Sequence, residues 1–268
     1  MNMAIHALVF SLLLTGCAGS KTEAQFDSNQ AIETVRAVSF SRFDGSVQGV
    51  TTCGESLLVV ADGAVWRVSQ DGSQNKVLSQ AAGVRYAYCL GNDSIMIVES
   101  IEPAPWKLFS RVLLNDDTVR HPTKFYLVGD HDFRRVSDEE FLFSSYLYGH
   151  WYVNHAGLRG KYLDNELLAH GRFPISCGEH CIFFIGPATT GYEIRTFQNN
   201  VETSLVSLPE DTPLGFERIQ GQFVIAYSDF LLWPETGKRI AISAPASQLL
   251  SWQNRLVVVT PNELFVTE

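Results

Sequence analysis

The chain has 268 residues, of which 46% are hydrophobic and 12% aromatic, and its formal net charge at pH 7 is −9. This length and composition are enough for a sizeable core, and a β architecture can use them as one domain. Because phosphate recognition needs clustered Lys and Arg, the acidic balance argues against nucleic acid as a partner.

Residues 1–16 have the pattern of an export signal. Residues 4–14 form an apolar run of signal-peptide length, too short to span a bilayer as a helix. The run ends in the sequence LTGC at 14–17, which resembles the lipobox of bacterial lipoproteins, although the first residues contain no Lys or Arg. An ordinary secretory signal that ends near a cysteine is the alternative.

The lipobox resemblance implies that the signal peptide is removed and that Cys17 becomes the lipidated first residue. The acyl chains would then hold the protein permanently on a membrane. Ala18 follows the cysteine where inner-membrane lipoproteins have Asp, so the resemblance implies the outer membrane, facing the periplasm or the cell surface. Residues 17–32 are polar and small, which is typical of a flexible tether, and 33–268 are expected to form a single folded domain.

The segment 51–72 is the clearest folding unit. Residues 57–61 form a short apolar run rich in β-branched side chains and bounded by turn residues, which predicts a buried strand. Asp62 and Gly63 then favour a tight hairpin turn into a strand over 64–68. A meander of this size cannot bury its own faces and therefore needs neighbours.

Similar units recur along the chain, and no segment of the expected domain predicts a helix. Six copies can be aligned, spaced by about 33 to 46 residues, which is the range of propeller blades. Their buried strands are expected to begin near residues 57, 95, 141, 182, 223 and 256. A fourth strand follows some copies, at 76–79, 203–208 and 238–243.

The sixth copy has no fourth strand of its own, because the sequence ends at Glu268. A segment with the matching pattern lies at 33–39, ahead of the first copy. If it joins the last sheet, the ring closes and exposed edges disappear. The sequence therefore predicts an all-β fold, a six-bladed β-propeller closed by an N-terminal strand, with a β-sandwich or other large β-barrel as the alternative.

Four cysteines remain after Cys17, and an oxidising compartment favours their pairing. Cys177 and Cys181 flank a tight turn and would face each other across a hairpin. Cys53 and Cys89 occupy the same position in adjacent copies, at the end of the innermost strand. We therefore predict the disulfides Cys53–Cys89 and Cys177–Cys181, with reduced buried thiols as the alternative.

No nucleophile elbow, zinc-protease motif, phosphate-binding loop or dinucleotide fingerprint is present, so no catalytic residue, metal or cofactor is assigned. Six-bladed propellers that open lactone rings use Glu, Asn and Asp around a central Ca²⁺. Glu99, Asn154, Glu217 and Asp229 lie near expected strand ends, but they do not align with that family's motif and receive no role.

Histidines and aromatic residues gather in the second and third copies. His150, Trp151, Tyr152 and His155 are the candidate ligand surface, but a run of strand aromatics with solvent-facing His is the preferred explanation, because the spacings match no metal signature. The leading functional hypothesis is a membrane-anchored envelope lipoprotein whose propeller is a non-catalytic scaffold for other envelope proteins. The alternatives are a propeller hydrolase or lactonase with a metal in the central funnel, and a propeller that binds a small ligand or glycan.

Overall fold

The structure is a computed structural model, which describes residues 37–79, 83–90, 94–101, 104–114, 117–126, 133–137, 139–159 and 162–267. Every regular element in these ranges is a β-strand. No helix long and apolar enough to cross a membrane occurs in the described part of the chain.

Four sheets contain four strands each. The first sheet comprises β2 (Val47–Cys53), β3 (Ser56–Ala61), β4 (Ala64–Val68) and β5 (Gln74–Leu78). The next two comprise β14 (Arg172–Gly178), β15 (Cys181–Pro187), β16 (Tyr192–Gln198) and β17 (Val201–Leu208), and then β18 (Gly215–Ile219), β19 (Gln222–Ala226), β20 (Phe230–Trp233) and β21 (Lys238–Ala241). The last has the order β1 (Ala37–Arg42), β24 (Glu263–Thr267), β23 (Arg255–Val259) and β22 (Gln248–Trp252).

The fifth sheet has eight strands and consists of two meanders. One comprises β6 (Val84–Leu90), β7 (Ser94–Ile101), β8 (Ala104–Leu114) and β9 (Asp117–Tyr126). The other comprises β10 (Arg134–Arg135), β11 (Glu140–Leu147), β12 (His150–Arg159) and β13 (Tyr162–His170). The outer strands β9 and β13 pair in parallel, with Leu163 opposite Thr123, and so join the two meanders.

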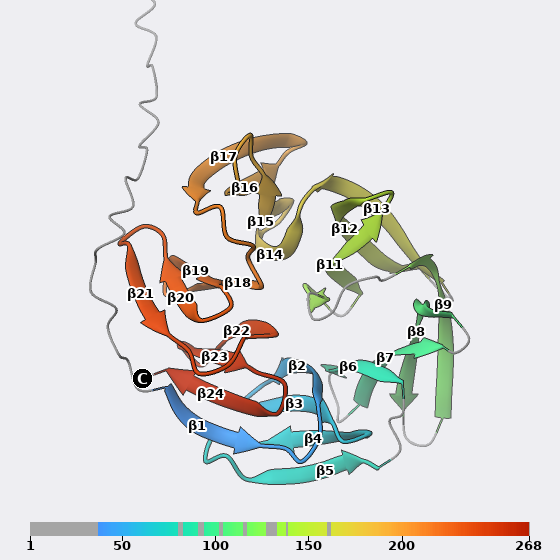
Figure 1. Cartoon of the computed structure of the whole chain (residues 1–268). Helices are drawn as coiled ribbons and strands as arrows, with labels where there is room; N and C mark the ends of the chain where they lie inside the picture. The colour runs from blue at the N-terminus through green and yellow to red at the C-terminus, as the bar shows by residue number, and fades with distance from the viewer. Residues whose placement is uncertain are drawn as a thin grey trace, which may run out of the picture.

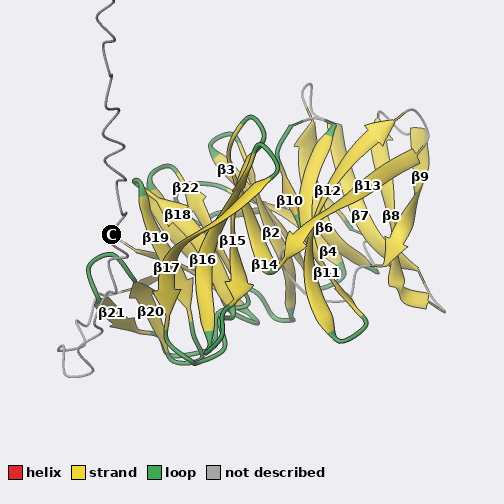
Figure 2. Cartoon of the chain, turned by 90° about the horizontal axis from the view of Figure 1, so that it is seen from above, coloured by secondary structure: helices red, strands yellow, loops and turns green. Residues whose placement is uncertain are grey.

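The sheets stand side by side around a central axis, as in a propeller (Figure 1). The first strands β2, β6, β14, β18 and β22 lie nearest the axis, together with the short strand β10. Seen from the side, the strands run roughly along the axis and the turns lie at the two ends of the ring (Figure 2).

The buried strands carry near-continuous apolar runs because each face packs against a different neighbour. In β3, Leu57 and Val59 join a core cluster shared with β22–β24, whereas Leu58 and Val60 join a cluster shared with β6 and β7. The strands β19 and β23 alternate in the same way. Among the described residues, six such clusters fill the spaces between successive meanders.

Tight turns connect many of these strands. In five hairpins, both residues at the turn have positive φ, as in a type I′ turn. The pairs are Asp62–Gly63, Tyr148–Gly149, Asn199–Asn200, Gln220–Gly221 and Gln253–Asn254. Gly, Asn and Asp accept this conformation most easily, so Tyr148, Gln220 and Gln253 are the unusual members of the set, and Tyr148 is the bulkiest of the three.

The predicted all-β, propeller-like fold is confirmed, but the described strands form five sheets. The sequence missed β9 and β13 as fourth strands. The first described strand begins at Ala37 and pairs antiparallel with β24, with Val38 opposite Val266. The signal peptide, Cys17, the tether and the start of the expected N-terminal strand (33–36) lie outside the described residues.

Candidate functional site

A cavity of about 430 Å³ is lined mainly by residues of the first strands, which surround the central axis. We call it the axial cavity. Its described lining comes from β2, β6, β18 and β22 and from residues 133–137, which include β10. The lining residues are Val50, Thr51, Thr52, Tyr88, Phe133, Arg134, Arg135, Val136, Ser137, Glu217, Gln248, Leu250 and Ser251.

A first strand has a neighbouring strand of its own sheet on one side only, so its axial backbone groups need other partners. The Gln248 side chain on β22 is the partner of two such backbone groups, both of them on β2. Its Oε1 accepts from Val50 N at 3.0 Å and its Nε2 donates to Val50 O at 2.8 Å. The buried hydroxyl of Thr51 donates to Ala87 O on β6. These bonds tie neighbouring sheets together at the axis.

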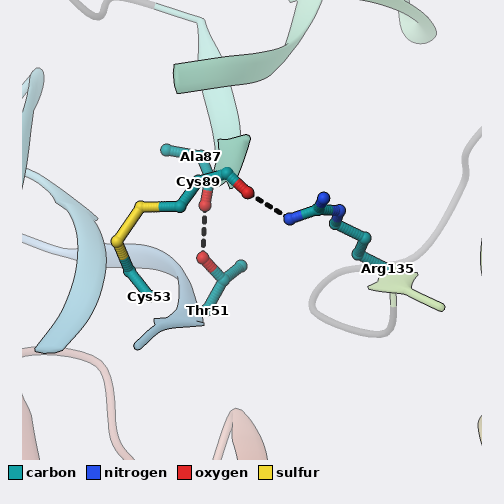
Figure 3. Close-up of a disulfide and its surroundings, with 5 residues drawn as sticks. All are labelled: Thr51, Cys53, Ala87, Cys89 and Arg135. Carbon is teal, nitrogen blue, oxygen red and sulfur yellow. Dashed lines mark hydrogen bonds between the residues drawn. A yellow bond between two sulfur atoms is a disulfide. The ribbon is translucent and has the colours of Figure 1, made fainter. Parts of the chain in front are cut away.

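A disulfide also joins β2 to β6, and Arg135 of β10 bonds to β6 beside it (Figure 3). The Arg135 Nη1 donates to Cys89 O, and its Nε donates to Ser137 O at 2.8 Å. Cys89 is in turn bonded to Cys53. Burial lowers the pKa of the Arg135 guanidinium, because desolvation disfavours the charged form. The Arg135 guanidinium is therefore partly buried in the wall of the axial cavity.

Arg134 and Glu217 form a largely buried ion pair in the same wall. The Arg134 Nη1 donates to Glu217 Oε2 at 2.7 Å, and the side chains are 17% and 7% exposed. The Arg134 Nη2 also donates to Phe216 O at 2.6 Å and to Leu249 O at 3.3 Å. The other carboxylate oxygen, Glu217 Oε1, accepts from Arg218 N at 2.8 Å. The pair thus joins β10, β18 and β22.

The sequence did not single out Arg134, Arg135, Thr51 or Gln248. The available signal was a pair of consecutive arginines in the expected first strand of the third copy, which is unusual in a chain that is acidic overall. That signal becomes meaningful only when the fold places this strand at the axis.

The described residues do not fit an axial Ca²⁺ site, which needs several converging oxygen ligands. Among the described lining residues, Glu217 is the only carboxylate, and both its oxygens already accept hydrogen bonds. Glu99 lies on β7, the Asn154 amide donates to Ser145 Oγ on β11, and Asp229 lies between β19 and β20. Within the described ranges, no group of three or more His, Cys, Asp or Glu residues could hold a metal ion.

The candidate ligand surface of the third copy lies on the β11–β12 hairpin and divides into two parts. His150 and Trp151 line a second cavity of about 170 Å³, together with Arg172 of β14. The Arg172 guanidinium lies 4.0 Å from the centre of the Trp151 ring, a cation–π contact. Tyr152 packs instead on His170 at 4.5 Å between ring centres. His155 Nε2 lies 3.8 Å from Glu140 Oε1, also outside the described lining.

The tip of this hairpin carries the most exposed large hydrophobic side chain in the described part of the protein. Tyr148 is 96% exposed, and Tyr146, which is 41% exposed, packs on Trp151 at 5.2 Å between ring centres. Tyr148 has φ +50°, a conformation that a bulky side chain adopts at a cost. We call residues 146–151 the aromatic hairpin. The sequence pointed to this aromatic region, but the predicted ligand surface did not include Tyr148.

Both predicted disulfides are confirmed. Cys53–Cys89 joins the first strands of neighbouring meanders, with Cα atoms 5.4 Å apart. Cys177–Cys181 closes the turn between β14 and β15, with Cα atoms 5.1 Å apart. One bridge links distant parts of the chain, whereas the other links residues that the hairpin already brings together.

No protein-family model matches the sequence, and no curated protein matches it. A gluconolactonase from Xanthomonas campestris is similar in structure, with a TM-score of 0.59 and 14% identity over 87% of this chain and 89% of that chain. The PQQ-bound aldose sugar dehydrogenase from Streptomyces coelicolor has a TM-score of 0.56 and 12% identity, over 88% and 98%. At these identities the likeness is one of fold alone, and it defines a propeller-like protein.

Proposed function

We propose that this chain is a membrane-anchored lipoprotein of the bacterial envelope whose propeller binds another envelope protein and catalyses no reaction. The sequence LTGC at 14–17 supports the anchor. The aromatic hairpin supports protein binding, and the exposure of Tyr148 is the observation that carries this part.

Tyr148 contributes little to the stability of its own chain. Its ring is almost fully exposed, and its positive φ is better suited to Asn or Gly. A strained and exposed aromatic side chain is therefore better explained by a partner than by the fold. Tyr and Trp are enriched among the residues that dominate protein interfaces, because they bury a large area with few rotatable bonds.

Site-specific photo-crosslinking in intact cells tests the binding surface. A crosslinker at position 148 should capture one envelope protein, and a crosslinker at position 201 should not. Val201 is the control because it is also exposed, at 61%, on the outer strand β17. Capture should also fall when Tyr146 is replaced by Ser. Equal capture from positions 148 and 201 would contradict the proposal.

The anchor has its own test, which does not depend on the partner. Wild-type protein should sediment with membranes and carry acyl chains on Cys17 in mass spectrometry. Replacement of residues 1–17 by an ordinary cleavable secretory signal, which removes both the apolar run and Cys17, should move the folded chain to the soluble fraction. Retention of the unacylated variant on the membrane would contradict lipid anchoring through Cys17.

We also infer that the ring has six blades and that β1 closes it. The eight-stranded sheet is then two blades joined at their outer strands. Six core clusters between successive meanders and the pairing of β1 with β24 support this count. Proteolytic removal of residues up to 42 should lower the unfolding temperature. No change would contradict closure by β1.

A hydrolase is the second candidate function, favoured by the fold that the chain shares with a gluconolactonase. The described lining of the axial cavity offers no converging carboxylates for it. Purified protein should therefore contain no stoichiometric Ca²⁺ or Zn²⁺ and should not open gluconolactone. Bound metal or opening of gluconolactone would favour the hydrolase over the scaffold, provided that Glu217→Gln abolishes it.

Binding of a glycan or another small ligand is the third candidate, favoured by the cavity beside Trp151. Trp151→Ala should then abolish binding in a glycan array while the fold remains intact. Absence of glycan binding by the wild-type protein would remove this candidate, and unchanged binding by Trp151→Ala would contradict the cavity beside Trp151 as its site.

A further inference from the structure

We propose that the small cavity beside the aromatic hairpin is an anchor pocket, into which the partner inserts one apolar side chain of about the size of phenylalanine. The inference rests on the proposed protein-binding role of the aromatic hairpin and adds the chemistry of the partner. We call this space of about 170 Å³ the hairpin cavity. It is lined by residues 149–151, by residues of β13, β14, β15 and β16, and by Pro213.

The hairpin cavity has an exposed rim and a buried apolar floor. His150 and Pro187 are exposed lining residues. Phe173 and Ile185 are each only 3% exposed, and Pro213 is also buried. A polar group that reached these three apolar side chains would lose water without gaining a hydrogen bond from them, which costs free energy. The floor therefore favours an apolar occupant.

The volume of the hairpin cavity limits its occupant to about one ring. An apolar cavity of roughly 150 Å³ accommodates a benzene molecule, whereas sites for drug-sized ligands measure roughly 300 to 1,000 Å³. The hairpin cavity, at about 170 Å³, therefore fits a single side chain such as phenylalanine. The backbone that carries this side chain has to stay outside, on the surface of the aromatic hairpin.

Contacts within the protein hold the walls of the hairpin cavity in place. The Trp151 ring lies 5.2 Å from the Tyr146 ring and 4.0 Å from the Arg172 guanidinium. Gly171 N donates to Trp151 O at 3.0 Å. A Cβ atom added at Gly171 would collide with the Phe184 ring, so this wall is closely packed. A pocket with ordered walls loses little conformational entropy when it is filled.

The hairpin cavity is continuous with the proposed protein-binding surface. His150 and Trp151 belong both to the aromatic hairpin and to the lining of the cavity. Tyr148, which is 96% exposed, lies at the turn of the same hairpin. Protein interfaces often combine a side chain buried in a pocket with surrounding aromatic contacts. One segment of the partner can therefore fill the hairpin cavity and contact Tyr148 at the same time.

Saturation-transfer NMR with N-acetylphenylalaninamide and N-acetylalaninamide tests the pocket on purified protein. The phenyl probe should bind with a dissociation constant of about 1 mM, and the alanyl probe, which lacks the ring, should not bind. His150→Trp and Pro187→Trp add bulk to the rim from β12 and β15, and each should abolish binding. Thr203→Trp adds the same side chain on the exposed strand β17 and should bind the phenyl probe like the wild type.

Photo-crosslinking from position 148 shows whether the partner uses the pocket. Both rim variants should reduce capture of the partner by about tenfold or more, because an anchor residue in a pocket carries a large share of the binding energy. Thr203→Trp should not reduce capture. Undiminished capture by rim variants that no longer bind the phenyl probe would overturn the inference and leave the protein-binding role intact. Absence of capture by the wild type would contradict that role itself.

Thermal unfolding should show that all three variants are folded. Failure of the wild type to bind the phenyl probe, or equal binding of the two probes, would also overturn the inference. Capture of a second copy of this chain, or displacement of the phenyl probe by a glycan, would identify a different occupant and so contradict it.

Discussion

The axial cavity and the aromatic hairpin are built in opposite ways. The axial cavity is assembled from side chains far apart in the sequence, such as Thr51, Arg134, Glu217 and Gln248. The aromatic hairpin consists of consecutive residues around one tight turn. We therefore expect changes at the axis to affect the stability of the whole ring, and changes at the hairpin tip to affect mainly recognition.

The disulfides offer the largest test of this contrast. If a disulfide stabilises by lowering the entropy of the unfolded chain, the double variant Cys53→Ser with Cys89→Ser should lower the free energy of unfolding by about 4 kcal/mol, because the bond spans 36 residues. Cys177→Ser with Cys181→Ser should cost about 2 kcal/mol, because that bond spans only 4. Urea unfolding of both double variants measures the difference. Equal costs would remove the distinction between the long-range bridge and the local one.

The ion pair at the axis should have the next largest effect. Glu217→Ala leaves the Arg134 guanidinium largely buried and without its carboxylate, which should cost about 3 kcal/mol. Glu202 is the matched control, because it pairs with Arg195 at the surface. Glu202→Ala should cost less than about 1 kcal/mol. A similar loss in both variants, measured by the urea midpoint, would argue against a special role for the axial pair.

Gln248 tests the link between β22 and β2. Gln248→Ala removes both hydrogen bonds to Val50 and leaves two buried backbone groups unpaired, which should cost about 2 kcal/mol. Gln253→Ala, at an exposed turn, should change stability by less than about 0.5 kcal/mol. Chemical denaturation distinguishes these outcomes, and a loss below that of the control would show that water replaces the amide.

Tyr148 should show the smallest effect on stability, and in the opposite direction. Tyr148→Asn relieves the cost of positive φ and should raise stability by about 1 kcal/mol. The same variant should lose affinity for the partner, because its exposed ring is gone. Thermal unfolding and binding measured on one preparation check both effects. A variant that is less stable, or that binds as well as the wild type, would contradict our interpretation of the hairpin.

The sequence predicted what is encoded locally. Apolar runs bounded by turns located the buried strands, and CGEHC at 177–181 located a hairpin with its disulfide. Cys53–Cys89 was predictable, although the residues are distant, because the repeat placed both at equivalent positions in adjacent copies.

The axial site and two outer strands were not predictable in this way. The strands β9 and β13 have weak patterns, since Pro122 cannot donate a ladder hydrogen bond and β13 mixes charged and apolar residues. The partners of Arg134 and Gln248 depend on which first strands meet at the axis, and no local pattern contains that information.

The buried strands pack against core residues on both faces, and this affects how their alignment is specified during folding. In β3, β19 and β23, successive residues are apolar and belong alternately to two different core clusters. A slip of one residue would exchange the two faces without exposing an apolar side chain to water, so hydrophobicity specifies the alignment of these strands only weakly. The two-residue turns at Asp62–Gly63, Gln220–Gly221 and Gln253–Asn254 fix that alignment instead. We therefore expect these two-residue turns to be the positions in the fold that tolerate an insertion least.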